Sequence, residues 1–161
     1  MRSLSLCWSL ILLCFISVPA QQKIDLEKER AALLEIHRTD RRAHFETDAN
    51  LLLERFTDEF IYVSNGKIER STRDELKKTF EDYFKNAKYY EWDDLEPPVI
   101  RISNDATMAW MIVRTKVRRI QKLASGEEKP RAFVYAGIMT YEKQNGRWIR
   151  IANVSTFEQL R

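Results

Sequence analysis

The feature that most constrains the fold is the last third of the chain, where three long strands are predicted in succession. They cover 107–121, 131–143 and 147–157, where apolar residues alternate along the chain in the manner typical of strands. Gly-containing turn signals separate them at Ser125-Gly126 and Asn145-Gly146. Successive strands joined by short turns pair with each other. The sequence therefore predicts a curved antiparallel sheet that can form the wall of a pocket.

Helices are predicted mainly before this sheet. Apolar residues recur at helical spacing over 23–46, and a shorter helix that carries Leu53 and Phe56 begins near Asp48, a plausible N-cap. A third helix begins at Thr72, because Thr72 and Glu75 have the spacing of a capping box.

Shorter strands complete the prediction. Asn65-Gly66 predicts a two-residue hairpin turn after the strand 60–63. A further strand region covers 89–102, and Pro97-Pro98 interrupts it, as expected at a sheet edge or a bulge. An antiparallel sheet with its helices gathered on one face is an α+β arrangement.

The first 20 residues are predicted to be a secretory signal peptide. Arg2 precedes an apolar run from Leu4 to Val18, and Val18-Pro19-Ala20 places small residues before a cleavage site. The run is short for a membrane span, so we expect cleavage and no stable membrane anchor afterwards. Residues 21–161 would then be a single exported domain, periplasmic or secreted.

Composition narrows the possible functions. Cys7 and Cys14 both lie in the predicted signal peptide, so the rest of the chain has no disulfide, thiol nucleophile or thiolate metal site. Arg2 is the one charged residue among the first 20, which leaves 26 basic against 24 acidic residues and a net charge of +2. Because these charges are interspersed, we expect no nucleic-acid partner.

Several segments resemble the NTF2-like superfamily. Residues 56–66 resemble its F-x-D-D-F segment and hairpin, 71–76 its third-helix start, and Gly146-Arg147-Trp148 its G-x-W closing strand. The order of these motifs over about 25–157 is similar to SnoaL-like and DUF4440-type members, which include ketosteroid isomerase-like proteins. The resemblance implies a cone-shaped fold, with three helices packed on the concave face of a curved antiparallel sheet. It also implies a pocket for a small apolar or acidic molecule, a homodimer formed through the sheet, and no cofactor.

The isomerase mechanism itself is not expected. Ketosteroid isomerases use a carboxylate base together with an oxyanion hole that contains a tyrosine. In an ungapped comparison, the tyrosine position falls on Asp40 and the base position on Ser64. Ser64 is a poor base because an unassisted hydroxyl does not accept a proton at neutral pH.

The first helix carries the best local candidates for chemistry. His37, Asp40, Arg41 and His44 fall at i, i+3, i+4 and i+7, so they share one face. If this face looks into the cone, His37 could act as a general base oriented by Asp40. A metal bound through His37, Asp40 and His44 is one alternative, and a solvated face with Asp40 paired to Arg41 or Arg38 is the other.

Arg114 is the second candidate. Period-two alternation predicts that Met108, Trp110, Ile112 and Arg114 share one face of their strand. An arginine after large apolar residues could bind a carboxylate at the end of an apolar pocket. The alternative is that Arg114 lies at the rim and pairs with Glu142.

The remaining candidates are aromatic or amide side chains on the strands. Trp92, Trp110 and Tyr135 are predicted to line the pocket, and Tyr62 is a further candidate for proton transfer. Asn153 lies where several relatives carry a histidine, so a usual acid or base is missing there.

These observations favour an exported domain that binds a small molecule, and they identify no reaction for it. The second hypothesis is an isomerase, dehydratase or cyclase in which His37, Asp40 or Tyr62 carries protons. The third is an interaction domain that binds a partner protein through its outer sheet face.

Overall fold

The computed structural model describes residues 24–160, so the predicted signal peptide lies outside the described residues. The helices are α1 (Leu26–Glu46), α2 (Ala49–Leu53) and α3 (Arg73–Lys85). The strands are β1 (Phe56–Ser64), β2 (Lys67–Thr72), β3 (Ala87–Asp94), β4 (Val99–Ile102), β5 (Met108–Lys122), β6 (Glu128–Gln144) and β7 (Arg147–Gln159). Within this part of the chain no helix is long and apolar enough to cross a membrane.

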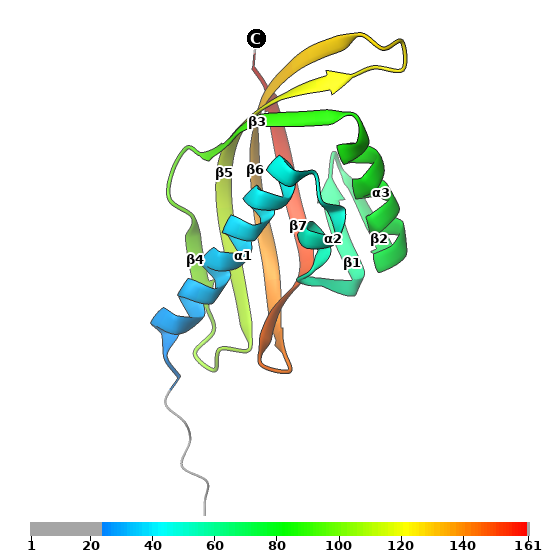
Figure 1. Ribbon diagram of the computed structural model, residues 1–161. Coiled ribbons are helices and arrows are strands. Elements are labelled where there is room, and N and C mark those ends of the chain that lie inside the picture. Colours follow the sequence, from blue (N-terminus) through cyan, green and yellow to red (C-terminus); the bar gives the residue numbers. More distant parts are fainter. Residues whose placement is uncertain (1–23, 161) are drawn as a thin grey trace, which may run out of the picture.

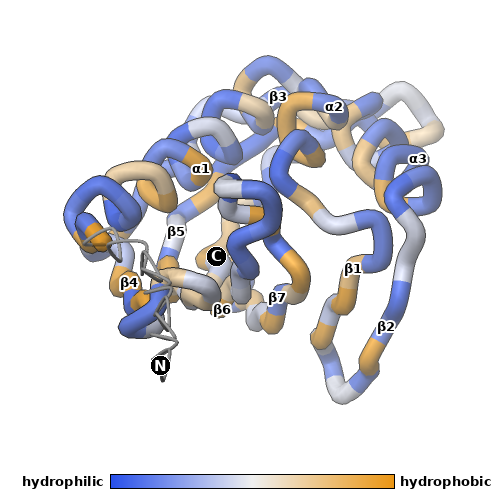
Figure 2. The backbone as a smooth tube through the Cα atoms, turned by 90° about the horizontal axis from the view of Figure 1, so that it is seen from below, coloured by the Kyte–Doolittle hydropathy of each residue, from blue (hydrophilic) through white to orange (hydrophobic). Residues whose placement is uncertain are grey.

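The seven strands form one curved sheet in the order β2-β1-β7-β6-β5-β3, and β4 also pairs with β5 (Figure 1). The helices lie on its concave side, as the view from below shows (Figure 2). The predicted α+β cone is therefore confirmed. One pairing refines the prediction: β1 and β7 run parallel, so the sheet is mixed rather than wholly antiparallel.

Side-chain caps position all three helices. Asp25 accepts hydrogen bonds from the backbone N–H groups of Glu27 and Lys28 at the start of α1, and Asp48 caps α2 in the same way. At α3 both hydrogen bonds of the predicted capping box are present between Thr72 and Glu75. Such caps satisfy N–H groups that have no partner inside the helix.

The second helix is shorter than predicted. It ends at Leu53, and Phe56 is the first residue of β1 instead of a helical residue. Phe56 pairs with Arg150 of β7 and packs in a buried cluster with Leu53, Phe60 and Leu76. Tertiary packing thus overrides the local helical pattern at this point.

The predicted turns connect the strands. Asn65 and Gly66 have φ angles of 51° and 74°, both in the left-handed region that a type I′ hairpin turn requires. Asn145 and Gly146 repeat this geometry between β6 and β7, with φ angles of 50° and 77°.

The inward face of β5 differs from the prediction. Met111, Val113 and Thr115 are at most 3% exposed and face the helices, whereas Ile112 and Arg114 are exposed on the convex side. Both faces of this strand are apolar, so alternation alone could not decide between them. Leu33 of α1 packs in the same cluster as Met111 and Val113, and the smaller side chains of this face allow the helix to come close to the sheet.

Candidate ligand-binding site

A cavity of about 760 Å³ lies between the helices and the concave face of the sheet. Its walls come from all three helices and from every strand except β4. The sequence-predicted candidates that line it are His37, Asp40, His44, Tyr62, Trp92, Tyr135 and Asn153. The structure thus brings seven of the ten candidates to one cavity.

The other three predicted site residues lie outside the cavity lining. Arg41 is exposed on α1, where it donates to Asp93 Oδ1 at 2.9 Å and to the Trp92 carbonyl oxygen at 2.8 Å. Trp110 and Arg114 lie on the convex face of β5. The prediction that they face the pocket is wrong, because α1 packs on the smaller residues of that strand.

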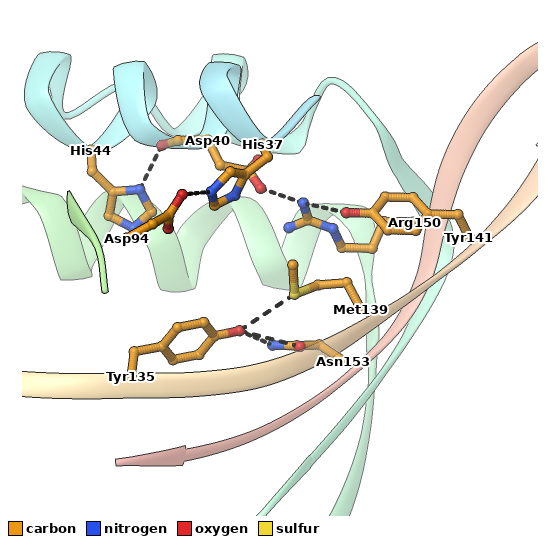
Figure 3. Close-up of polar contacts among 9 residues, drawn as sticks. All are labelled: His37, Asp40, His44, Asp94, Tyr135, Met139, Tyr141, Arg150 and Asn153. Carbon is orange, nitrogen blue, oxygen red and sulfur yellow. Dashed lines mark hydrogen bonds and ion pairs between the residues drawn. The ribbon is translucent and has the colours of Figure 1, made fainter. Parts of the chain in front are cut away.

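Asp40 forms a buried ion pair with Arg150, a partner that the sequence did not indicate (Figure 3). Arg150 also donates to the Tyr141 hydroxyl at 3.1 Å, and its guanidinium lies 4.7 Å from the centre of the Phe56 ring. Burial disfavours its charge, but the Asp40 carboxylate outweighs this and raises the pKa of Arg150. Arg150 therefore stays charged beneath the cavity, with its Nε buried and unpaired within the described chain.

His44 presents a neutral imidazole to the cavity. Its Nδ1 lies 2.7 Å from the carbonyl oxygen of Asp40, so Nδ1 carries the proton and Nε2 carries the lone pair (Figure 3). The ring stacks on Trp92, with centroids 3.5 Å apart. Desolvation by burial lowers the pKa of His44 to about 4, and the nearby Arg150 and Arg119 charges act in the same direction.

His37 is oriented by Asp94 rather than by Asp40. His37 Nε2 lies 2.7 Å from Asp94 Oδ2 (Figure 3). Asp94 Oδ1 accepts a hydrogen bond from Thr115 at 3.1 Å. Burial acts to raise the pKa of Asp94, but these hydrogen bonds and the His37 charge outweigh it and hold that pKa below its ordinary value. The expected His37–Asp40 pair is therefore replaced by a His37–Asp94 pair, of which His37 lines the cavity.

Two tyrosines contribute hydroxyl groups from the sheet. The Tyr62 hydroxyl lies 2.5 Å from Ser155 Oγ. The Tyr135 hydroxyl lies 3.2 Å from Asn153 Nδ2 and 3.7 Å from Met139 Sδ (Figure 3). Burial raises the pKa of Tyr135 to about 12. The Tyr135 hydroxyl thus stays protonated near neutral pH.

Bulges explain how the sheet brings these groups together. In the β6–β7 register Tyr141 pairs with Arg150 and Thr140 pairs with Ala152, so Ile151 is an extra residue. This bulge places Arg150 and Asn153 on the same inward face although they are three residues apart. A bulge between Tyr89 and Glu91 does the same for Tyr89 and Trp92 on β3.

The metal alternative finds no support in the geometry. Asp40 is bound to Arg150, His37 is bound to Asp94, and the Nδ1 of His44 donates to the backbone. Among residues 24–160 no three His, Asp or Glu side chains are grouped so that they could hold a metal ion.

Solved structures share the fold of this chain. A ketosteroid isomerase-like protein from Erwinia carotovora atroseptica matches with a TM-score of 0.60 at 18% identity, over 81% of this chain and 96% of that one. A conserved protein from Planctomyces limnophilus matches with a TM-score of 0.64 at 15% identity, over 83% and 99% of the two chains. An NTF2-like protein with a cystatin-like fold from Novosphingobium aromaticivorans matches with a TM-score of 0.58 at 16% identity, over 81% and 82%.

The chain has the NTF2-like fold. No protein-family model and no curated protein matches it, so the SnoaL-like or DUF4440-type subgroup stays a prediction. Likeness at these identities establishes the fold, which hosts many functions. Of the two positions that correspond to the isomerase residues, Asp40 lines the NTF2-like cavity and Ser64 does not.

Sequence reasoning missed four residues that shape the polar part of the NTF2-like cavity: Asp94, Tyr141, Arg150 and Ser155. Arg150 had a detectable signal, since it is a charged residue within an apolar closing strand. Asp94, Tyr141 and Ser155 had none, because their roles depend on contacts between elements that are distant in the sequence.

Proposed function

We propose that this chain is an exported domain that binds a small molecule with a largely aromatic or apolar body. The cavity carries the proposal, because its volume of about 760 Å³ is in the usual range for small-molecule sites. Its lining is rich in aromatic side chains, and the rings that contribute are Phe56, Phe60, Tyr62, Phe80, Tyr83, Trp92, Phe133, Tyr135 and Phe157.

The polar groups of the cavity favour binding over a reaction. Asp40 is neutralised by Arg150, and the Tyr62 hydroxyl is bound to Ser155. Neither is a free acid or base in this arrangement. The Tyr135 hydroxyl is likewise bound to Asn153 and Met139. His44 Nε2 is an acceptor, so this group can fix the orientation of a ligand without transferring a proton.

The test is binding of a neutral aromatic dye, N-phenylnaphthylamine, whose fluorescence rises in an apolar site. We expect the purified protein to bind it and Val113→Trp to abolish binding, because Val113 lines the cavity. Ile112→Trp, at the adjacent outward position, is the matched control and keeps binding. Circular dichroism checks that both variants fold. Absence of dye binding, or equal binding by both variants, contradicts the proposal.

Export is supported by the sequence of the first 20 residues. The expected outcome is cleavage after Ala20, measured as the intact mass of the protein recovered from the host periplasm or medium. Recovery of the full-length chain from the cytosol alone would contradict export, and it would leave the ligand-binding proposal standing.

A proton-transfer enzyme is the second candidate, and the His37–Asp94 pair specifically favours it. Asp94 accepts from Nε2 of His37, and no side chain or backbone group within residues 24–160 bonds to Nδ1. The pair thus resembles a base with its orienting carboxylate, on the wall of an apolar cavity. Tyr62 and Asp40 are less suited to this role, because each is already bound to another side chain.

This candidate is tested without knowing the natural substrate. A panel of small ketones is incubated with the protein in deuterium oxide, and deuterium incorporation next to the carbonyl is measured by mass spectrometry. Catalysed exchange that is lost in His37→Gln and kept in Arg38→Gln, an exposed neighbour on α1, supports an enzyme. Exchange that is equal in all three proteins excludes His37 as the base.

A further inference from the structure

Two arginines face each other across the inner surface of the sheet. Arg119 of β5 and Arg131 of β6 are direct partners in the antiparallel register, and both side chains line the cavity. Directly opposed residues on one face have Cβ atoms roughly 5 Å apart, and like charges in such a pair destabilise a sheet. A fold that keeps this pair needs a counter-charge.

The described residues provide no counter-charge. Neither Arg119 nor Arg131 has a carboxylate within 4.0 Å among residues 24–160. The outward cations of the same strand differ: Lys116 and Arg118 both bind Glu91, at 2.9 and 3.2 Å. A carboxylate therefore lies beside two outward cations of β5, Lys116 and Arg118, and none of residues 24–160 places one within 4.0 Å of the inner pair.

The hydrogen bonds of the pair are also incomplete. Arg119 Nη1 donates to the Tyr89 hydroxyl at 2.8 Å, and its Nε is buried without a partner. Burial raises the pKa of Tyr89 above its ordinary value, so this hydroxyl is neutral and does not balance the charge of Arg119. Arg131 makes no side-chain hydrogen bond within the described part of the chain.

Aromatic rings hold the Arg119 guanidinium in place. Its central carbon lies 4.6 Å from the Tyr83 ring centre, 5.6 Å from that of Tyr89 and 5.9 Å from that of Phe133. Cation–π contacts of this kind orient the group without satisfying its N–H donors. Arg131 is exposed and still lines the cavity, which places the pair near its rim.

One acid in the lining has no ion-pair partner among residues 24–160, Glu69 of β2. In the sheet order, β2 is separated from β6 by β1 and β7. The other lining acid, Asp40, is bound to Arg150. Neither acid therefore neutralises the arginine pair.

We infer that Arg119 and Arg131 together bind the anionic group of the ligand, a carboxylate or sulfonate, while its aromatic or apolar body occupies the cavity. The inference rests on the proposed ligand-binding function and narrows it to amphipathic anions. Paired guanidinium groups suit an oxyanion because each offers several donors in a planar arrangement. The anion site inferred from the structure thus consists of two arginines that face the cavity, and Arg114, the arginine that the sequence indicated, is not part of it.

The experiment compares two dyes that share one aromatic skeleton. Anilinonaphthalenesulfonate carries a sulfonate, and N-phenylnaphthylamine is its uncharged counterpart. We expect the protein to bind the anionic dye at least about tenfold more tightly, and Arg131→Met to reduce that affinity about tenfold, as expected for one charge-assisted hydrogen bond. Arg131→Met leaves binding of the neutral dye unchanged. Added salt weakens only the anionic dye.

Arg118→Met is the matched control, because Arg118 is adjacent to Arg119 but points outward to Glu91. Arg119→Met tests the second arginine and also removes the Tyr89 hydrogen bond, so Arg131→Met decides the outcome if Arg119→Met does not fold. Equal affinity for both dyes, with no effect of Arg131→Met, overturns this inference and leaves the proposed function intact. If neither dye binds, both this inference and the proposed ligand-binding function fail.

Discussion

At the scale of single residues, Gly137 determines where Tyr135 lies. A Cβ at Gly137 would meet the Tyr135 hydroxyl oxygen at 2.3 Å and the Val154 carbonyl oxygen at 3.1 Å. The tyrosine ring thus crosses the glycine to reach Asn153. We expect Gly137→Ala to lower the free energy of unfolding by about 1–3 kcal/mol, as overpacking does. Urea unfolding followed by circular dichroism measures the change.

The Gly137→Ala prediction has an internal control. In the Tyr135→Leu background the crossing ring is absent, so the penalty of Gly137→Ala shrinks to the smaller contribution of the Val154 carbonyl. If the penalty is the same in both backgrounds, the clash with Tyr135 is not its cause.

His44 predicts a loss of stability in mild acid. Its pKa falls from an ordinary 6.5 to about 4 in the folded protein, chiefly because burial disfavours the charged ring. Between these values the unfolded chain binds more protons than the folded one. The contribution of His44 to the free energy of unfolding is therefore complete above pH 6.5. It declines as the pH falls toward 4, by about 3 kcal/mol in total.

The measurement for His44 is urea unfolding over this pH range, in the original protein and in His44→Asn. The asparagine amide can still donate to the Asp40 carbonyl oxygen but does not titrate. Carboxylates such as Asp94, whose pKa is lowered in the fold, also lose stability in acid, so the difference between the two proteins is the readout. A difference that stays constant with pH would refute the role of His44.

At the scale of elements, the capping box keeps the first turn of α3 in place. The helix carries Leu76, Phe80 and Tyr83 into the cavity wall, and Thr72 accepts from the Glu75 backbone N–H. Thr72→Ala should lower the free energy of unfolding by about 1 kcal/mol and speed amide exchange in the first turn.

The control for Thr72→Ala is Thr79→Ala on the same helix. The Thr79 hydroxyl donates to the Glu75 carbonyl oxygen, a bond that adds little stability inside a helix. Thr79→Ala should change the free energy of unfolding by no more than about 0.5 kcal/mol. Equal losses in the two variants would show that the cap has no special role.

The elements themselves follow from local chemistry, which is why the sequence predicts them well. Caps at Asp48 and Thr72 and the turns at Asn65-Gly66 and Asn145-Gly146 depend on neighbouring residues only. Helical spacing likewise placed His37, Asp40, Arg41 and His44 on one face; the first two and His44 line the cavity, and Arg41 does not.

The rest of the site depends on contacts between elements. On β5 both faces are apolar, and the position of α1 decides that Val113 and not Arg114 faces the cavity. The bulge at Ile151 reverses the alternation of β7 midway, without a glycine or proline to announce it. Period-two reasoning beyond a bulge assigns every later residue to the wrong face, so Ser155, the partner of Tyr62, could not be predicted.

At the scale of the whole molecule, the convex face of the sheet carries an apolar row that no other part of residues 24–160 covers. Register partners on five adjacent strands align along it, namely Val99, Ile112, Ile138, Val154 and Val63. Val99, Ile112 and Val154 are 47%, 42% and 43% exposed. A contiguous apolar surface of this kind marks an interaction site, and a second copy of the same chain offers a matching surface.

We expect the protein to be a homodimer through this face and Ile112→Lys to convert it to a monomer, because the lysine would place an unpaired charge in a dry interface. Sedimentation equilibrium over a range of concentrations measures the mass. Leu26→Lys is the control, since Leu26 is 46% exposed at the start of α1, on the helix side of the sheet and outside the row. A monomeric original protein, or a dimer that survives Ile112→Lys, contradicts this assembly. Because Ile112 lies outside the cavity lining, dye binding by the monomeric variant would further show that one chain forms a complete binding site.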